Sequence, residues 1–288
     1  MKKIVSAILA ITLIMGLTVP AFATEAGEQR VALGADLSSS ERADILDDFG
    51  LEDGAVDEIT VTNADERKYL EGVISDSAIG TRALSSVYII TREEGEGLDI
   101  SLNNITWITE EVYRNALITA GITDARVTIS APSYGVSGTA ALTGIYKAYE
   151  DITGEKLSEA AKEVAAEEMV VTGELADELG SEDAAALVNE LKLVIKELKG
   201  MTDDEVREEI RSIADNQNVS LTDDQVEQLL SLCRSLEGVN LDSLTSALQS
   251  VADTFGSLSA VGEKATGIWG AIKNFFSSIG DFFSNLFS

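Results

Sequence analysis

The sequence of 288 residues contains no histidine, one cysteine and two prolines. Histidine is the usual general base near neutral pH, the usual partner of serine and cysteine nucleophiles, and a frequent metal ligand, so its absence removes the most common hydrolase mechanisms. The single cysteine, Cys233, excludes a disulfide within the chain. Its place among helical leucines favours a small buried side chain over a reactive thiol.

Basic residues are also scarce, since 21 lysines and arginines face 50 aspartates and glutamates and leave a formal net charge of −29. Nucleic-acid binding requires a basic surface that neutralises phosphates, so we expect no nucleic-acid partner. The negative field would attract cations or basic peptides, although an acidic coat that maintains solubility is the simpler explanation. Calcium-loop, Walker and dinucleotide-binding motifs are missing, so we expect no metal and no cofactor.

Residues 1–23 have the three parts of a secretory signal peptide: two basic residues at positions 2–3, an apolar run over 4–19, and small residues at the site Ala21-Phe22-Ala23. This pattern predicts cleavage after Ala23 and a mature protein, residues 24–288, that is secreted or associated with the cell envelope. An uncleaved membrane anchor is the alternative, but the apolar run is shorter than the roughly 20 residues that a membrane span needs.

Residues 24–150 alternate short β-rich runs with helical patterns, which predicts an α/β domain built on a mixed sheet. The expected strands are 30–34, 56–62, 84–92, 98–107 and 126–131. Runs 84–92 and 98–107 are separated by a segment rich in glycine and charge, and we expect them to pair as a hairpin.

Helix-start signals lie between these strands. Ser38 with Glu41 forms a capping-box pattern, and Asn63 is expected to cap a second helix. A third helix should start at Thr109, and a fourth should follow the loop 133–138 and end near residue 150.

Strand signals vanish after residue 150, and an acidic, all-α helical region is expected over 151–266. The expected helices are 155–172, 181–199, 202–215, 222–237 and 241–260. Thr202 and Thr222 each begin a capping-box pattern with acidic residues in the first turn, where the helix dipole favours them.

The last segment, 267–288, predicts an amphipathic helix with an aromatic stripe. Its apolar side chains would be costly to leave in water, so something must cover them. Three hypotheses stay open: packing inside the protein, contact with a membrane surface, and self-association. The residues of this stripe are Trp269, Ile272, Phe275, Phe276, Ile279, Phe282, Phe283, Leu286 and Phe287.

The loop before the fourth helix is a candidate ligand site. Ser137, Gly138 and Thr139 join a strand to a helix, so their backbone amides could hold a carboxylate or phosphate group together with Arg82. The alternative is structural: Ser137 or Thr139 caps the helix while the glycines allow a tight turn. The motif misses the G-x-S-x-G nucleophile elbow, because Thr139 stands where the last glycine belongs.

Trp107 follows two asparagines at the end of an expected strand. An aromatic ring beside two amides suits a carbohydrate contact, whereas core packing is the usual role of a lone tryptophan.

Four stretches resemble the YpuA-like family of secreted proteins from Gram-positive bacteria, a domain-of-unknown-function family. They are residues 34–38 (GADLS), 79–86 (IGTRALSS), 115–132 (NALITAGITDARVTISAP) and 136–150 (VSGTAALTGIYKAYE). The resemblance implies an exported, envelope-associated protein, and it transfers no activity and no catalytic residue.

Together these patterns favour an exported, non-enzymatic binding or structural protein of unknown ligand, for which a cell-wall component is one candidate. The alternative is a secreted hydrolase that acts without histidine on a cell-wall polymer or peptide. Such an enzyme would use a pair of carboxylates, or a Ser-Lys arrangement with Ser137 as the nucleophile.

Overall fold

The computed structural model describes residues 26–74 and 76–248. The expected signal peptide, 1–23, and the expected aromatic helix, 267–288, lie outside the described residues, so both stay predictions.

The first half of the chain forms a five-stranded mixed sheet, as the sequence predicted. Its strands follow the order β2-β1-β3-β5-β4, in which β1 pairs in parallel with β2 and β4 in parallel with β5. The central strand β3 runs antiparallel to both of its neighbours. The bounds are β1 Gln29–Gly34, β2 Glu58–Val61, β3 Ser86–Thr91, β4 Leu98–Asn103 and β5 Ala125–Ser130.

The predicted hairpin of the third and fourth strands is wrong, because β5 lies between β3 and β4. The connection between them contains a turn, in which the Glu96 amide donates to the Glu93 carbonyl (3.0 Å), and it passes the start of β5. The Arg92 amide donates to the carbonyl of Asp124 (3.2 Å), and the Gly97 amide donates to the Asp124 carboxylate (2.8 Å). The six linking residues, 92–97, are enough to cross two strand spacings of about 4.8 Å each. A glycine-rich segment of this length can therefore join two neighbouring strands as a hairpin, or join two strands that have a third strand between them.

Helices α1 (Ser39–Asp48) and α4 (Glu110–Ala120) connect the two parallel strand pairs. The predicted caps are present at Ser38, which forms a full capping box with Glu41, and at Thr109. The second helix, α2 (Asn63–Leu70), starts one residue earlier than expected: Thr62 is its cap, because the Thr62 hydroxyl accepts the amide of Asp65. A short helix, α3 (Asp76–Ile79), follows.

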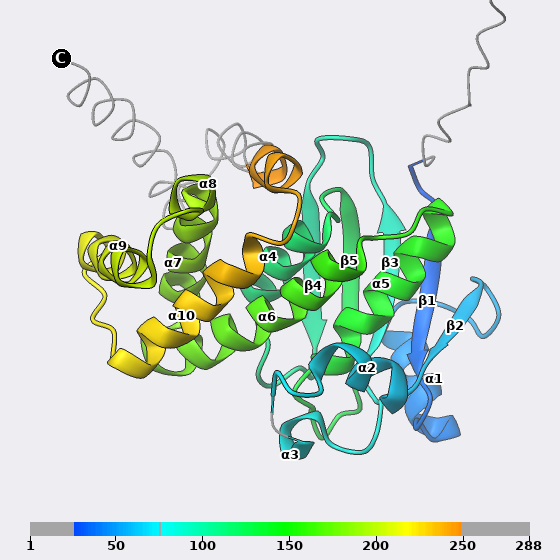
Figure 1. Ribbon diagram of the computed structural model, residues 1–288. Helices are drawn as coiled ribbons and strands as arrows, with labels where there is room; N and C mark the ends of the chain where they lie inside the picture. The colour runs from blue at the N-terminus through cyan, green and yellow to red at the C-terminus, as the bar shows by residue number, and fades with distance from the viewer. Residues whose placement is uncertain (1–25, 75, 249–288) are drawn as a thin grey trace, which may run out of the picture.

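Alternate residues of the strands face the two sides of the sheet. Ala32 and Val87 belong to the main core, where they pack under Gly144 of helix α5 (Thr139–Thr153), and Figure 1 shows α5 lying across the sheet. Val31 and Leu33 point to the opposite side and form a smaller cluster with α1. Helix α5 is thus anchored on the sheet, which fixes the position of its first turn.

The second half of the described chain is helical, as predicted. Both expected threonine caps, Thr202 and Thr222, form full capping boxes, and helical backbone runs from Leu241 to the last described residue. The helices are α6 Glu159–Leu179, α7 Ser181–Leu193, α8 Ile195–Leu198, α9 Asp203–Asn216 and α10 Asp223–Leu236. Among the described helices, none is both long and apolar enough to cross a membrane.

One continuous cluster of buried side chains extends from the sheet into the helical region, and α6 packs along α4. Cys233 is buried in this cluster, and its burial raises the pKa of the thiol to about 12. A protonated, buried thiol is unreactive, in agreement with the structural role expected for Cys233. The division into domains at residue 150 stays a prediction.

Candidate functional site

The first turn of α5 is built around Gly138. Its φ angle of 101° lies in the left-handed region, and a Cβ atom there would come within 2.5 Å of the Tyr113 hydroxyl. Tyr113 donates a hydrogen bond to the Gly138 carbonyl (2.6 Å). No side chain caps the helix at this point. The expectation that Ser137 or Thr139 caps α5 is therefore wrong, because Gly138 itself occupies the cap position.

The loop that carries Ser137 is held by the chain segment after β4. The Thr106 amide donates to the Val136 carbonyl (2.8 Å), and the Ile108 amide donates to the Ser137 carbonyl (3.2 Å). Asn104, at φ 58°, turns the segment so that its carbonyl accepts the amide of Val136 (3.1 Å). Backbone hydrogen bonds thus fix the position of Ser137 next to the start of α5.

The carboxylate of Glu66, from α2, lies at the start of α5. The Thr139 hydroxyl donates to one of its oxygens (2.6 Å), and the Asn63 amide donates to the other (3.3 Å). Glu66 is only 1% exposed. A helix N-terminus favours a negative charge, and here a carboxylate of the protein itself lies where the sequence suggested an external anion.

Burial raises the pKa of Glu66, and the hydrogen bonds from Thr139 and Asn63 and the charge of Arg67 only partly oppose that rise. The Arg67 guanidinium forms its ion pair with Asp76 (2.7 Å). Across residues 26–74 and 76–248, no lysine or arginine lies within salt-bridge distance of Glu66. Glu66 is therefore a buried carboxyl group held by neutral donors.

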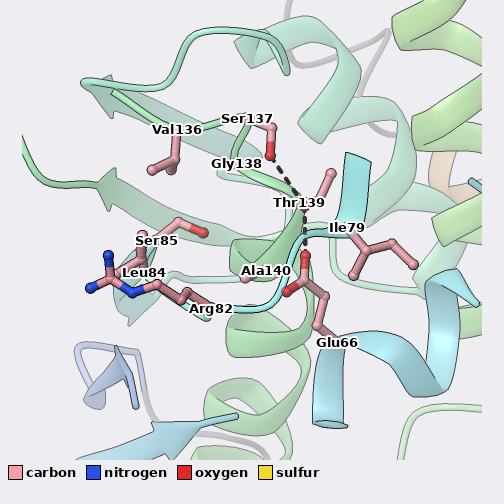
Figure 2. Close-up of a pocket in the computed structure, with 10 residues that line it drawn as sticks. All are labelled: Glu66, Ile79, Arg82, Leu84, Ser85, Val136, Ser137, Gly138, Thr139 and Ala140. Carbon is pink, nitrogen blue, oxygen red and sulfur yellow. Dashed lines mark hydrogen bonds between the residues drawn. The ribbon is translucent and has the colours of Figure 1, made fainter. Parts of the chain in front are cut away.

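A pocket open to solvent lies between this carboxyl group and Arg82 (Figure 2). Its volume is about 30 Å³. The structure thus brings together four of the predicted ligand-binding residues, Arg82 and Ser137–Thr139, from segments more than fifty positions apart. The lining residues are Glu66, Ile79, Arg82, Leu84, Ser85, Val136, Ser137, Gly138, Thr139 and Ala140.

Arg82 lies at the end of the pocket opposite Glu66 (Figure 2). Its Nη2 donates to the backbone carbonyl of Asp36 (2.8 Å), and the Asp36 carboxylate accepts the Ala83 amide (2.8 Å). In the described part of the chain Arg82 forms no ion pair within 4.0 Å, although acidic residues outnumber basic ones by more than two to one. Its guanidinium retains donors for a ligand.

Ser85 is the second polar group with unused hydrogen-bonding capacity. It is 3% exposed, and its hydroxyl has no hydrogen-bond partner among the residues that the structure describes. In Figure 2 its oxygen points into the space between the Arg82 segment and the Ser137–Thr139 loop. The hydroxyl is therefore available to a ligand or a water molecule in the pocket.

Tyr134 lies near Arg82, outside the residues that line the pocket, and is 61% exposed. Its hydroxyl donates to the Glu41 carboxylate (2.9 Å), and the nearby charge of Arg82 opposes the rise in the pKa of Tyr134 that burial and Glu41 cause. An exposed aromatic residue inside a loop of glycine, serine and proline was the sequence signal that could have identified it. Glu66 and Ser85 gave no such signal, because their neighbours in space come from distant segments.

Trp107 does not belong to this pocket. Its Nε1 donates to Asp177 of α6 (3.2 Å), and its ring lies against Gly173 of the same helix. The packing interpretation of Trp107 therefore fits the structure better than the carbohydrate one.

The surroundings of Ser137 are relevant to catalysis. Its hydroxyl lies 3.3 Å from the Thr139 hydroxyl, and the structure, where it describes the chain, shows no hydrogen bond from it to a lysine or a carboxylate. The same residues hold no group of three or more acidic or cysteine side chains arranged to bind a metal ion. The arrangement can bind a polar group, but it does not activate Ser137 as a nucleophile.

Comparisons with known proteins confirm the predicted family. The family described as "Protein of unknown function (DUF1002)" matches residues 33–253. The "Uncharacterized protein YpuA" of Bacillus subtilis (strain 168) is 42% identical over 247 residues, which is 84% of each chain. No solved structure matches the chain.

Proposed function

Because the chain belongs to the DUF1002 family, whose function is unknown, we propose its function from the pocket: it is an exported, non-enzymatic binding protein. The supporting observation is the hydroxyl of Ser85, which has no hydrogen-bond partner among the described residues and points into a pocket lined at one end by Arg82 and at the other by Glu66. These groups leave donors and acceptors free in a fixed geometry.

Co-sedimentation with insoluble bacterial cell wall tests the binding role. We expect the full protein to sediment with the wall and Arg82→Gln to stay in solution. Arg126→Gln is the matched control, because Arg126 pairs with Asp99 on the surface (2.9 Å) outside the pocket. If the wild-type protein does not sediment, or if Arg82→Gln sediments equally well, the proposed binding of a wall component by this pocket is wrong.

Export is supported by the signal-peptide pattern at residues 1–23. Mass spectrometry of the protein from expressing cells tests it. We expect an N-terminus at Thr24 and recovery from the medium or envelope. An intact Met1 on protein found in the cytoplasm would contradict export.

The aromatic segment 267–288 supplies a second contact in this proposal, with the membrane surface or with another copy of the chain. Flotation with neutral and anionic liposomes tests the membrane contact, and sedimentation equilibrium tests self-association. The comparison uses the mature chain and a variant with Phe275→Ser, Phe276→Ser, Phe282→Ser and Phe283→Ser. If the variant floats and sediments as the unaltered chain does, the segment makes neither contact.

Glu66 favours one enzymatic alternative, a hydrolase that uses carboxyl groups. A buried carboxyl with a raised pKa at a pocket wall is the kind of group that serves as a general acid. This alternative predicts release of soluble fragments from cell wall by the wild-type protein, and loss of that release in Glu66→Gln. Absence of any fragment release contradicts it.

A further inference from the structure

We infer that the ligand of this pocket is a neutral sugar ring, with Tyr134 providing the aromatic surface against which the ring packs. This inference rests on the proposed binding function and specifies its ligand class. It depends on four observations: the charges at the two ends of the pocket, its free hydroxyl groups, its size, and the exposed ring of Tyr134 near Arg82.

The charges argue against a small ion. The carboxylate of Glu66 already accepts the Thr139 hydroxyl at the start of α5, so a ligand anion placed there would lie beside a like charge. A ligand cation would meet the positive end of α5, a helix of 15 residues, and the guanidinium of Arg82. A neutral group avoids both penalties.

The hydrogen-bonding groups match hydroxyls. Arg82 can only donate, and the Glu66 carboxyl group accepts hydrogen bonds at both of its oxygens. Ser85 and Ser137 lie between these two residues along the lining and can do either. The lining thus offers a donor at one end and an acceptor at the other. It suits a ligand whose own groups both donate and accept hydrogen bonds, and the hydroxyls of a sugar have that property.

The dimensions favour a small group of a larger ligand. The cavity measures about 30 Å³ and opens to solvent, whereas pockets that enclose drug-sized ligands have volumes of about 300–1,000 Å³. One hydroxyl or hydroxymethyl group of a sugar would enter, and the ring and the rest of an oligosaccharide would lie at the opening.

Tyr134 lies near Arg82, which forms one end of the pocket. Its hydroxyl is held by Glu41, which restrains the ring, while 61% of the residue remains exposed to solvent. The C–H face of a sugar is apolar, and a rigid aromatic ring with a tethered hydroxyl offers it a contact surface at low entropic cost. Tyr134, and not Trp107, is the aromatic residue that the structure assigns to carbohydrate.

Saturation-transfer difference NMR on the full protein tests the inference. The probes are the β-1,4-linked tetramer of N-acetylglucosamine, cellotetraose, acetate and ethylammonium, and the variants are Tyr134→Ala, Tyr134→Phe and Ser85→Ala. We expect transfer to at least one of the two sugars. The dissociation constant should rise about tenfold in Tyr134→Ala, as for loss of one aromatic contact, and less in Ser85→Ala. Tyr134→Phe should have a smaller effect than Tyr134→Ala, since it keeps the ring and loses only the tether to Glu41.

The outcomes separate the ligand class from the proposed function. If acetate or ethylammonium binds in a manner sensitive to Ser85→Ala while both sugars fail, the pocket is a binding site and the sugar assignment is wrong. If a sugar binds equally well to wild type, Tyr134→Ala and Ser85→Ala, it binds elsewhere and the assignment also fails. If no probe binds, and the protein does not sediment with cell wall, the proposed function fails as well.

Discussion

Glu66 and Glu168 are both buried glutamates, and their surroundings differ in kind. Glu168, in α6, is 0% exposed and pairs with Lys192 of α7 (2.8 Å), whose ammonium also donates to the Asn115 carbonyl (3.1 Å). Thr119 donates to the other oxygen of Glu168. Glu66 has neutral donors only, and it touches a pocket.

The comparison teaches how to separate structural from functional buried charge. Burial raises the pKa of both carboxyl groups, and it lowers the pKa of Lys192. In the helical region the charges compensate each other, away from solvent. In the pocket no cation pairs with Glu66 among the described residues, and only the neutral donors of Thr139 and Asn63 reach its carboxyl group. The pKa shifts alone would not distinguish the two sites.

The largest expected effect comes from breaking the compensated pair. Lys192→Met leaves the Glu168 carboxylate buried without a cation, and we expect a loss of about 3–5 kcal/mol in the free energy of unfolding, measured by urea denaturation. The double variant Lys192→Met with Glu168→Leu removes both charges and should recover most of that loss. A single variant as stable as wild type would show that the pair is not sealed from water.

Gly138→Ala should have the next largest effect, about 1–3 kcal/mol, because it adds a Cβ in the left-handed region and against the Tyr113 hydroxyl. Gly121→Ala is the matched control. Its φ is 94°, but no atom lies within 4 Å of the added Cβ. Thermal denaturation should therefore show a smaller loss for Gly121→Ala, and equal losses would mean that Tyr113 does not restrict this turn.

Trp107→Phe should cost about 1 kcal/mol, since it removes the hydrogen bond to Asp177 and part of the ring that covers Gly173. Urea denaturation measures that cost. Binding of the tetrasaccharide probe should not change, because the pocket lies elsewhere. A loss of binding without a loss of stability would return Trp107 to the list of ligand contacts.

Glu66→Gln should have the smallest effect on stability, and the effect should depend on pH. Because the folded pKa of Glu66 is raised, the folded protein binds this proton at a higher pH than the unfolded chain. The carboxyl then contributes its stability fully below the unfolded pKa, about 4.3, and loses it as pH rises through the folded pKa.

Unfolding curves at a series of pH values check this sign. From about pH 4 to neutral pH, wild type should lose stability relative to Glu66→Gln. Glu168→Gln, the same change at the paired site, should be destabilising at neutral pH because it leaves Lys192 without its carboxylate. If both substitutions have the same sign at pH 7, the distinction between the two glutamates is wrong.

The sequence predicted the features that depend on local interactions. Ser38, Thr109, Thr202 and Thr222 cap helices as expected, because a cap and its partner lie within three residues of each other. For α2 the expected cap, Asn63, was off by one residue, because Thr62 is the cap in the structure.

Non-local features were predicted less well. The hairpin prediction was wrong because β5, some thirty residues later in the chain, lies between β3 and β4. The residues that link β3 to β4 do not show where β5 will pair. The site was predicted in part, because glycine and hydroxyl residues before a helix indicated Ser137–Thr139. Glu66 and Ser85 reach the pocket from distant parts of the chain, and Ser85 does so where its segment packs closely against Gly34.

The contrast between the two glutamates can be measured in one sample by following the side-chain carboxyl ¹³C resonances of Glu66 and Glu168 during addition of the N-acetylglucosamine tetramer. We predict that the Glu66 resonance shifts with saturating dependence on the sugar while the Glu168 resonance stays in place. A stationary Glu66 resonance at sugar concentrations that saturate the protein, or equal shifts of both, would contradict the central claim that Glu66 borders a ligand site and Glu168 is sealed in the core.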